Sequence, residues 1–368
     1  MKKLIKYIVS GILFLVLSTV GVQVMQAEES VPYSVKPILP SNQIDKELQY
    51  FDLKMKPGEE QTIEVAVSNS SNKEIELEMS TETAITNVNG VIDYVSSEKD
   101  IVFDQTLHYP FSTFTSMAET ITVPANETVN VPIKINMPQE EITGMILGGI
   151  KFTEKSSDSQ EESTNGMAIR NRFAYIIAVK LTEDDQPVAG DLQLNKIKAD
   201  QVSYRNVISA NLQNPEPALI KDLAIEAEVT AAGSSKVLYQ QTNQDFKMAP
   251  NSNFDFPIYL ENQPLKAGKY TLHLTATSGE EKWDFTQDFE ISKDEAARLN
   301  KDSAIELEEG VNWQLYLIIA GCILGGIVLG IIIWQVLRRR KQEIQKANQK
   351  KRPRKKNTKT SPRKNKSK

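Results

Sequence analysis

Cysteine and histidine are nearly missing from this 368-residue sequence, which holds one Cys and two His. The single cysteine, Cys322, lies in a long uncharged stretch near the C-terminus, so no disulfide can form within the rest of the chain. A zinc site needs three or four clustered His or Cys ligands, which this composition excludes. Secreted eukaryotic domains of this size often carry disulfides, so their absence favours a bacterial surface protein that folds without them.

Motifs of the common enzyme classes are missing as well. His108 and His273 have no serine, cysteine or second histidine at the spacing that nucleophilic catalysis needs, and GxSxG, P-loop and GxGxxG sequences do not occur. Carboxylate pairs such as Glu59-Glu60 are frequent because the chain is acidic, so they are weak indications of a glycosidase. The acidic run at 183–185 lacks the spacing of a calcium loop. We therefore expect a protein that is not an enzyme and binds no cofactor or metal.

The two ends of the chain carry the signals of a single-pass membrane protein. Residues 1–27 combine a basic start, an apolar run and a small final residue, which predicts a secretory signal peptide, with an uncleaved anchor as the alternative. Met25 leaves the exact cleavage site open. Residues 313–337 are uncharged over a length that spans a bilayer. Residues 338–368 hold 16 Lys or Arg and one Glu, so the positive-inside rule places this tail in the cytoplasm and the preceding part outside the cell.

This topology makes the extracellular part strongly acidic. The formal net charge of the chain is −5, and removing +15 for residues 338–368 and +3 for residues 1–27 leaves −23 for residues 28–312. An acidic surface suits cationic partners rather than anionic polymers. The basic tail follows the span directly, so contact with anionic lipid is a simpler interpretation of its KKRPRKK sequence than nucleic-acid binding.

Alternating apolar residues predict β-strands in the first half of the extracellular part. Residues 61–69 place Ile63, Val65 and Val67 on one face, and residues 129–135 repeat this pattern. The Asn-Gly sequence at 89–90 is a strong signal for a tight turn. The apolar segments GMILGGIKF and FAYIIAVKL flank a polar stretch, so they predict a hairpin with a long exposed connection.

The second half repeats this style, with turns between short strands. Together the two halves predict an all-β protein of two tandem immunoglobulin-like β-sandwich domains. The amphipathic stretch 293–300 is expected to begin a stalk. The residues expected on the inward faces of the second module are Leu223, Ile225, Ala227, Val229, Phe254, Phe256, Ile258, Leu260, Tyr270, Leu272, Leu274, Ala276, Trp283, Phe285, Phe289 and Ile291.

The pentapeptide ILGGI occurs twice, at 146–150 and at 323–327. In the first copy apolar residues lie on both faces of a predicted strand, so the strand is expected to be central, and adjacent glycines imply a close backbone approach, a bulge or a bend. The second copy lies in the predicted span. There, small residues four apart let helices pack closely, so a homo-oligomer is a hypothesis and high glycine content alone is the alternative. The candidate association residues are Gly321, Gly325, Gly326 and Gly330.

Several motifs, in the right order over nearly the whole chain, resemble the WxL-interacting proteins of Gram-positive bacteria. The resemblance implies a peptidoglycan-binding domain over 31–153, whose last hairpin could extend to 182, and a host-ligand-binding domain over 165–300. A stalk at 301–312, the transmembrane helix at 313–337 and the basic tail follow. The motifs are YFDL at 50–53, PG at 57–58, AITNVNG at 84–90 with Tyr94, MP at 137–138, GMILGGI at 144–150, AYI at 174–176, LQN at 212–214, APNS at 249–252, LKAGKY at 265–270 and LN at 299–300.

The resemblance implies an adhesion scaffold whose partners are peptidoglycan, WxL-domain proteins and a host extracellular-matrix protein. Asn87, Asn89 and Tyr94 are the candidate glycan contacts, since glycans are bound by amide and aromatic side chains on an exposed face. The YFDL segment is interpreted either as a core strand or as a contact surface. An assembly chaperone that lends an edge strand is the alternative function. A wall-modifying enzyme is disfavoured because acid–base chemistry would depend on carboxylates alone.

Overall fold

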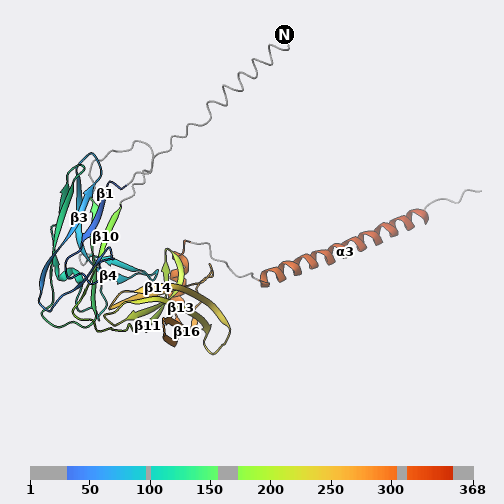
Figure 1. Cartoon of the computed structure of the whole chain (residues 1–368). Coiled ribbons are helices and arrows are strands. Elements are labelled where there is room, and N and C mark those ends of the chain that lie inside the picture. The colour runs from blue at the N-terminus through green and yellow to red at the C-terminus, as the bar shows by residue number, and fades with distance from the viewer. Residues whose placement is uncertain (1–30, 97–100, 156–172, 305–312, 351–368) are drawn as a thin grey trace, which may run out of the picture. The chain divides into compact units, whose positions relative to one another are not determined.

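The computed structural model describes residues 31–96, 101–155, 173–304 and 313–350 (Figure 1). Residues up to Leu307 belong to one compact unit and residues from Glu308 onwards to another, and each is described by itself. The predicted signal peptide, the end of the basic tail and most of the predicted stalk lie outside the described residues.

The first sandwich consists of two sheets that pack face to face. One sheet has the order β1-β3-β8-β6, and the other has the order β2-β10-β9-β4-β5, with β7 also paired to β4. A 3-10 turn, η1 (Phe111–Thr113), lies between β5 and β6. The strands are β1 (Tyr33–Ile38), β2 (Phe51–Lys54), β3 (Glu60–Asn69), β4 (Ile75–Thr86), β5 (Ile92–Val95), β6 (Thr115–Ser116), β7 (Thr120–Val123), β8 (Thr128–Asn136), β9 (Met145–Glu154) and β10 (Ala174–Thr182).

The apolar alternation in the sequence determines the core of this sandwich. Ile63, Val65 and Val67 are almost completely buried, as predicted, and pair with Ile133, Val131 and Val129 of β8. Each such side chain contributes about 1.5–3 kcal/mol by leaving water. Phe51 and Leu53 are completely buried, so the core-strand interpretation of the YFDL segment is confirmed for these two residues.

The first ILGGI copy is in β9, a central strand between β10 and β4, as expected. Ile146, Gly148 and Ile150 face the core, and a side chain at Gly148 would collide with the Phe111 ring. Gly149 faces outward, where an added Cβ would lie 2.8 Å from Ile176 Cγ2 and 3.0 Å from Tyr94 Cδ1. The predicted close approach therefore occurs on both faces of the sheet.

Strand β10 pairs with two neighbours of unequal length. Its antiparallel register with β9 runs from Ala174↔Thr153 to Thr182↔Met145, which confirms the predicted pairing of the two apolar segments. Its parallel register with β2 covers only Val179–Thr182. β1 of the opposite sheet lies beside the start of β10, where the Tyr33 and Tyr175 rings meet edge to face with centroids 5.2 Å apart (Figure 1).

The second sandwich has sheets of order β11-β12-β15 and β14-β13-β16-β17. Its core contains the predicted inward residues, with Trp283, Phe285 and Phe289 partly buried at its margin. His273 points outward, as predicted, with Nδ1 3.2 Å from Thr286 Oγ1. The strands are β11 (Gln193–Val202), β12 (Arg205–Asn214), β13 (Ile220–Ala231), β14 (Val237–Met248), β15 (Ser252–Tyr259), β16 (Gly268–Ser278) and β17 (Glu281–Ile291).

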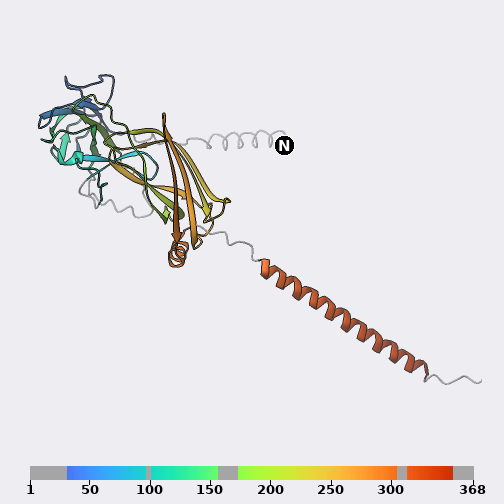
Figure 2. The same ribbon diagram turned by 90° about the horizontal axis from the view of Figure 1, so that it is seen from below.

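The expectation that residues 293–300 begin a stalk is wrong. They form α2 (Lys293–Asp302), which begins at the N-cap Ser292 and packs Ala296 and Leu299 into the core of the second sandwich. Figure 2 shows α2 at one end of this sandwich. Asn300 fixes the helix end, because its side chain accepts from Leu265 N at 2.8 Å and donates to Leu265 O at 2.9 Å. The alternation of apolar residues was read correctly, but what the apolar side of the helix would contact was not.

Helix α3 (Trp313–Lys350) contains the predicted span. Within the described residues, the segment long and apolar enough to cross a membrane is Gly321–Glu343. This range begins and ends later than the predicted 313–337 but shares most of it. Nothing in the structure lies within 4 Å of a Cβ placed at the four candidate association glycines, so helix association stays a prediction.

Candidate functional site

The outward side of the β2-β10-β9-β4-β5 sheet carries an aromatic and charged surface, here named the outer face. We define it by Tyr50 and Asp52 around the start of β2, Ile176 and Lys180 of β10, Gly149 and Lys151 of β9, Glu82 of β4 and Tyr94 of β5. These side chains share one side of the sheet because alternate strand residues point the same way and the strands are in register.

Tyr94 lies on this face because its neighbour has no side chain. Its ring approaches the Cα of Gly149, and Ile176 flanks it from β10. Burial, followed by the nearby Tyr50, raises the pKa of Tyr94, so its hydroxyl stays protonated at neutral pH. A half-buried tyrosine offers a rigid apolar ring with a polar end, which suits the mixed surface of a sugar.

Two lysine–carboxylate pairs flank the ring across the sheet. Lys180 Nζ lies 3.1 Å from Asp52 Oδ1 but donates its hydrogen bond to Oδ2 at 3.3 Å, so Oδ1 has no hydrogen-bond partner. Lys151 Nζ lies 3.9 Å from Glu82 Oε1, which also accepts from a serine hydroxyl. The carboxylates are buried and the lysines are partly exposed. The face therefore presents ammonium groups to solvent over buried acids.

Asn87 and Asn89 lie in the turn between β4 and β5. Asn87 Oδ1 accepts from Asn89 N at 3.0 Å and from Val91 N at 3.3 Å, so this amide supports its own turn. Gly90 has a φ of +64°, as the Asn-Gly signal predicted. The Asn89 side chain is exposed. The structure thus brings the two asparagines together but separates them from the Tyr94 ring, which lies over the middle of the sheet.

The same turn contacts the second sandwich, a role that the sequence did not reveal. Lys247 N donates to Gly90 O at 2.8 Å, and the Phe246 ring occupies the place of a side chain at Gly90. The Thr86 hydroxyl accepts from Ala249 N at 3.0 Å and lies 2.6 Å from Ser252 Oγ. We name this set of contacts, with those of residues 104 and 144–145 described next, the junction.

Asp104 and Gly144 complete the junction. Asp104 accepts from Gln213 Nε2 at 2.8 Å and from Asn253 Nδ2 at 2.5 Å. Burial, the largest influence, raises the pKa of Asp104, but hydrogen bonds from Thr106, Asn253 and Gln213 together hold it below its ordinary value. Gly144, with φ +77°, packs against the Pro217 backbone. Met145 N donates to Pro217 O at 2.9 Å.

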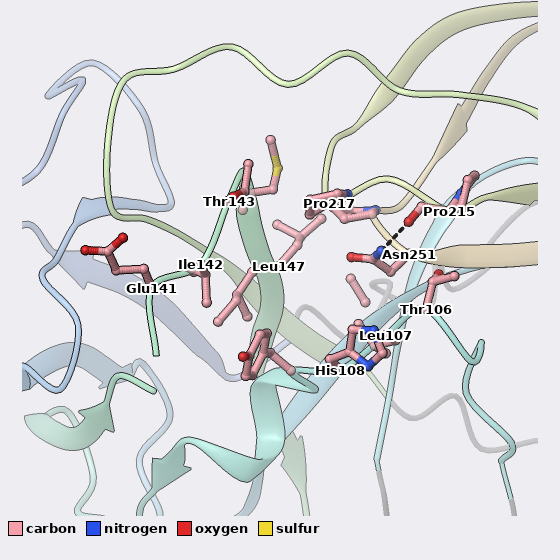
Figure 3. Close-up of a pocket in the computed structure, with 15 residues that line it drawn as sticks. Thr106, Leu107, His108, Glu141, Ile142, Thr143, Leu147, Pro215, Pro217 and Asn251 are labelled. Carbon is pink, nitrogen blue, oxygen red and sulfur yellow. Dashed lines mark hydrogen bonds between the residues drawn. The ribbon is translucent and has the colours of Figure 1, made fainter. Parts of the chain in front are cut away.

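A cavity of about 330 Å³ opens beside the junction (Figure 3). Its walls are mostly apolar, with three prolines from turns of the second sandwich. Asn251 closes one side and donates to Pro215 O at 2.6 Å. The lining also contains His108, Tyr109 and Glu141, which are polar groups at the mouth of an apolar space. Such a cavity can hold a small group of a ligand.

No group of three or more His, Cys, Asp or Glu residues that could hold a metal occurs in the described part of the chain. His108 lies in a loop of the first sandwich and His273 on a strand of the second, as the sequence indicated. Tyr109 donates to Glu140 Oε2 at 2.9 Å, so this hydroxyl is occupied by a local contact. The arrangement offers surfaces and a cavity for binding.

Solved structures similar to this chain are fimbrial chaperones and related β-sandwich domains. A chain from a CFA/I fimbriae chaperone–tip adhesin complex is 11% identical over 71% of this chain and 98% of its own, with a TM-score of 0.30. A chain from the CsuC-CsuE complex of Acinetobacter baumannii is 10% identical, covers 70% and 98%, and has a TM-score of 0.31. Similarity at this level says nothing about what this chain binds. No curated protein matches the chain.

Two family models match the chain in tandem. The model of the WxL Interacting Protein peptidoglycan binding domain matches residues 33–154, and that of the WxL Interacting Protein host binding domain matches residues 164–301. The matched ranges divide before β10, although β10 pairs with β9 and β2 of the first sandwich. The chain therefore belongs to the WxL-interacting protein family, with a peptidoglycan-binding domain followed by a host-binding domain.

Proposed function

We propose that this protein is a non-catalytic scaffold of the cell surface, held in the membrane by α3 with both sandwiches outside and the basic tail in the cytoplasm. The first sandwich binds peptidoglycan through the outer face. The second sandwich binds a host matrix protein, and WxL-domain proteins are the bacterial partners that the family name indicates. The apolar stretch of α3 and the basic tail after it support this orientation.

The observation that carries the glycan assignment is the Tyr94 ring over Gly149, between two lysine–carboxylate pairs. Sugar rings have apolar faces that pack on aromatic rings, and their hydroxyl and amide groups form hydrogen bonds. Partly exposed ammonium groups beside the ring supply donors, and peptidoglycan carries carboxylates that these groups attract. The acidic extracellular part as a whole does not favour anionic polymers, so the local lysines provide the attraction.

The test is co-sedimentation of the full-length protein, solubilised in detergent, with insoluble purified peptidoglycan. Tyr94→Ala is expected to weaken binding about 10-fold, the effect of losing one central aromatic contact. Tyr204→Ala is the matched control, because Tyr204 is an exposed tyrosine of the second sandwich. Equal sedimentation of the wild type and both variants would contradict the assignment of the outer face.

Assembly of secreted surface proteins is the alternative function. A chaperone holds its client until assembly and then releases it, whereas a scaffold keeps its partner. Persistent co-purification of a WxL-domain protein after detergent extraction would support the scaffold. Release of that protein during assembly at the wall would support the chaperone.

A further inference from the structure

The outermost strands of both sandwiches differ in how their free edges are protected. Natural sheets block free edges with short strands, prolines, bulges or charges, because an unprotected edge pairs with other chains. In the first sandwich, β5, β6 and β7 are short and β1 contains Pro37. In the second, β15 contains Pro257, the β11 register shifts between Leu194 and Ile197, the β14 register shifts repeatedly, and β17 is rich in charge.

The first half of β10, residues 174–178, is an exception that we name the open edge. The β2 strand covers the same side of β10 only from Val179 onwards, and within the described residues no strand lies opposite the preceding part. The open edge reads Ala-Tyr-Ile-Ile-Ala, without a charge or a proline. Its register with β9 contains no shift. None of the usual protecting devices is therefore present in this segment.

The direction of the free backbone groups follows from one hydrogen bond. Thr182 O accepts from Met55 N at 2.9 Å, so the backbone groups of Thr182 point towards the β2 side. Alternate residues of a strand direct their N–H and C=O groups to the same side. Ala174 and Ile176 therefore present theirs to the uncovered side, and both residues are exposed.

A row of donor and acceptor pairs at this spacing matches the backbone of another strand. The side chains beside the row are apolar, with Ile176 on the outer face and Tyr175 and Tyr33 on the core side. We propose that the open edge receives one extended segment of a WxL-domain protein, in line with β2, as an added strand. This inference rests on the proposed function, in which a WxL-domain protein is a lasting partner.

The test uses the full-length protein in lipid nanodiscs and a purified WxL-domain protein as the probe. Hydrogen exchange of the wild type is expected to slow at the amides of Ala174 and Ile176 when the probe binds. Ala174→Pro removes one outward N–H at the first strand position, where proline is tolerated, and is expected to weaken binding about 10-fold. Ala174→Ser keeps this N–H and serves as the control at the same position. Neither change is expected to alter peptidoglycan co-sedimentation.

The outcomes separate this inference from the function on which it rests. If the probe binds without slower exchange at 174–178, and equally to both variants, the open edge is not the docking site but the partner class stands. If the probe does not bind the wild type at all, both the added strand and the WxL part of the proposed function are wrong. Loss of binding in both variants would point to a side-chain effect and contradict strand addition.

Discussion

The two sandwiches use the same architecture but close their sheets differently. The second has a core cluster of Phe246, Phe254 and Phe256 rings with centroids 6.1–6.5 Å apart, and its outermost strands carry protecting devices. The first has adjacent glycines in a central strand, buried carboxylates on an outward face and a partly uncovered edge. The comparison teaches that the first sandwich departs from ordinary sheet packing at the places where we propose contacts with other molecules.

The largest expected effect tests the two sides of β9 against each other. Gly148→Ala places a methyl group in the ring of Phe111, which is completely buried, and is expected to lower the free energy of unfolding by about 2–3 kcal/mol. Gly149→Ala meets Ile176 and Tyr94, which are partly exposed and can shift, so about 1 kcal/mol is expected. Denaturant unfolding measures both. Equal losses would show that the two faces are packed alike.

Gly148→Ala combined with Phe111→Leu serves as the control for this mechanism. A smaller side chain opposite the new methyl group should recover part of the lost stability relative to the sum of the two single changes. Strict additivity would mean that the cost of Gly148→Ala has another origin than the ring.

The second effect concerns the junction, which the two sandwiches share. Gly144 and Gly233 both have positive φ angles, +77° and +75°, but only Gly144 faces neighbouring atoms, those of Pro217. Both alanine substitutions carry the strain of a left-handed backbone, about 1–2 kcal/mol. Gly144→Ala is expected to cost about 1–3 kcal/mol more, because the clash is with backbone that cannot rotate away. Equal thermal unfolding of the two variants would argue against a tightly packed junction.

Asp104 gives the junction a dependence on acid. The pKa of Asp104 is lower in the folded state than its unfolded value of about 3.9, so its contribution to stability is complete above that value and is lost as the pH falls through the lower folded pKa. Hydrogen exchange around Gln213 and Asn253 should therefore accelerate in strong acid. Asp104→Asn should remove this part of the pH dependence, and an unchanged acid profile in that variant would contradict the role of Asp104.

The smallest expected effect separates the two predicted asparagines. Asn87→Ala loses the two turn hydrogen bonds and should cost about 1 kcal/mol, whereas Asn89→Ala changes an exposed side chain and should stay within about 0.5 kcal/mol. Peptidoglycan binding by Asn89→Ala then reports on ligand contact without a change in the fold. If Asn89→Ala is the more destabilising of the two, the turn is held differently from this description.

Much of the fold follows from local sequence signals, because strand alternation depends on neighbouring residues. The inward residues of the second module, the β9–β10 pairing and the close approach at Gly148 and Gly149 were all predicted. The role of α2 was not, since an amphipathic stretch shows that one side is apolar but not what covers it. The junction was also missed, because Thr86, Gly90 and Asp104 meet partners more than 100 residues away.

For the candidate site, Tyr94 was selected from the sequence, while its neighbours on the outer face were not. Asp52 and Glu82 lie on strands with polar alternation, which ordinarily places such residues in solvent. Their burial depends on the register of β2, β10, β9 and β4, which single-sequence patterns do not give. The open edge likewise depends on where β2 stops pairing.

The most direct test of the central claim is hydrogen exchange of the full-length protein with and without soluble peptidoglycan fragments. The outer face predicts slower exchange confined to β4, β5, β9 and β10, with the β1-β3-β8 sheet and the second sandwich unchanged. Protection confined to the second sandwich, or to the β1-β3-β8 sheet, would contradict the assignment of glycan binding to the outer face.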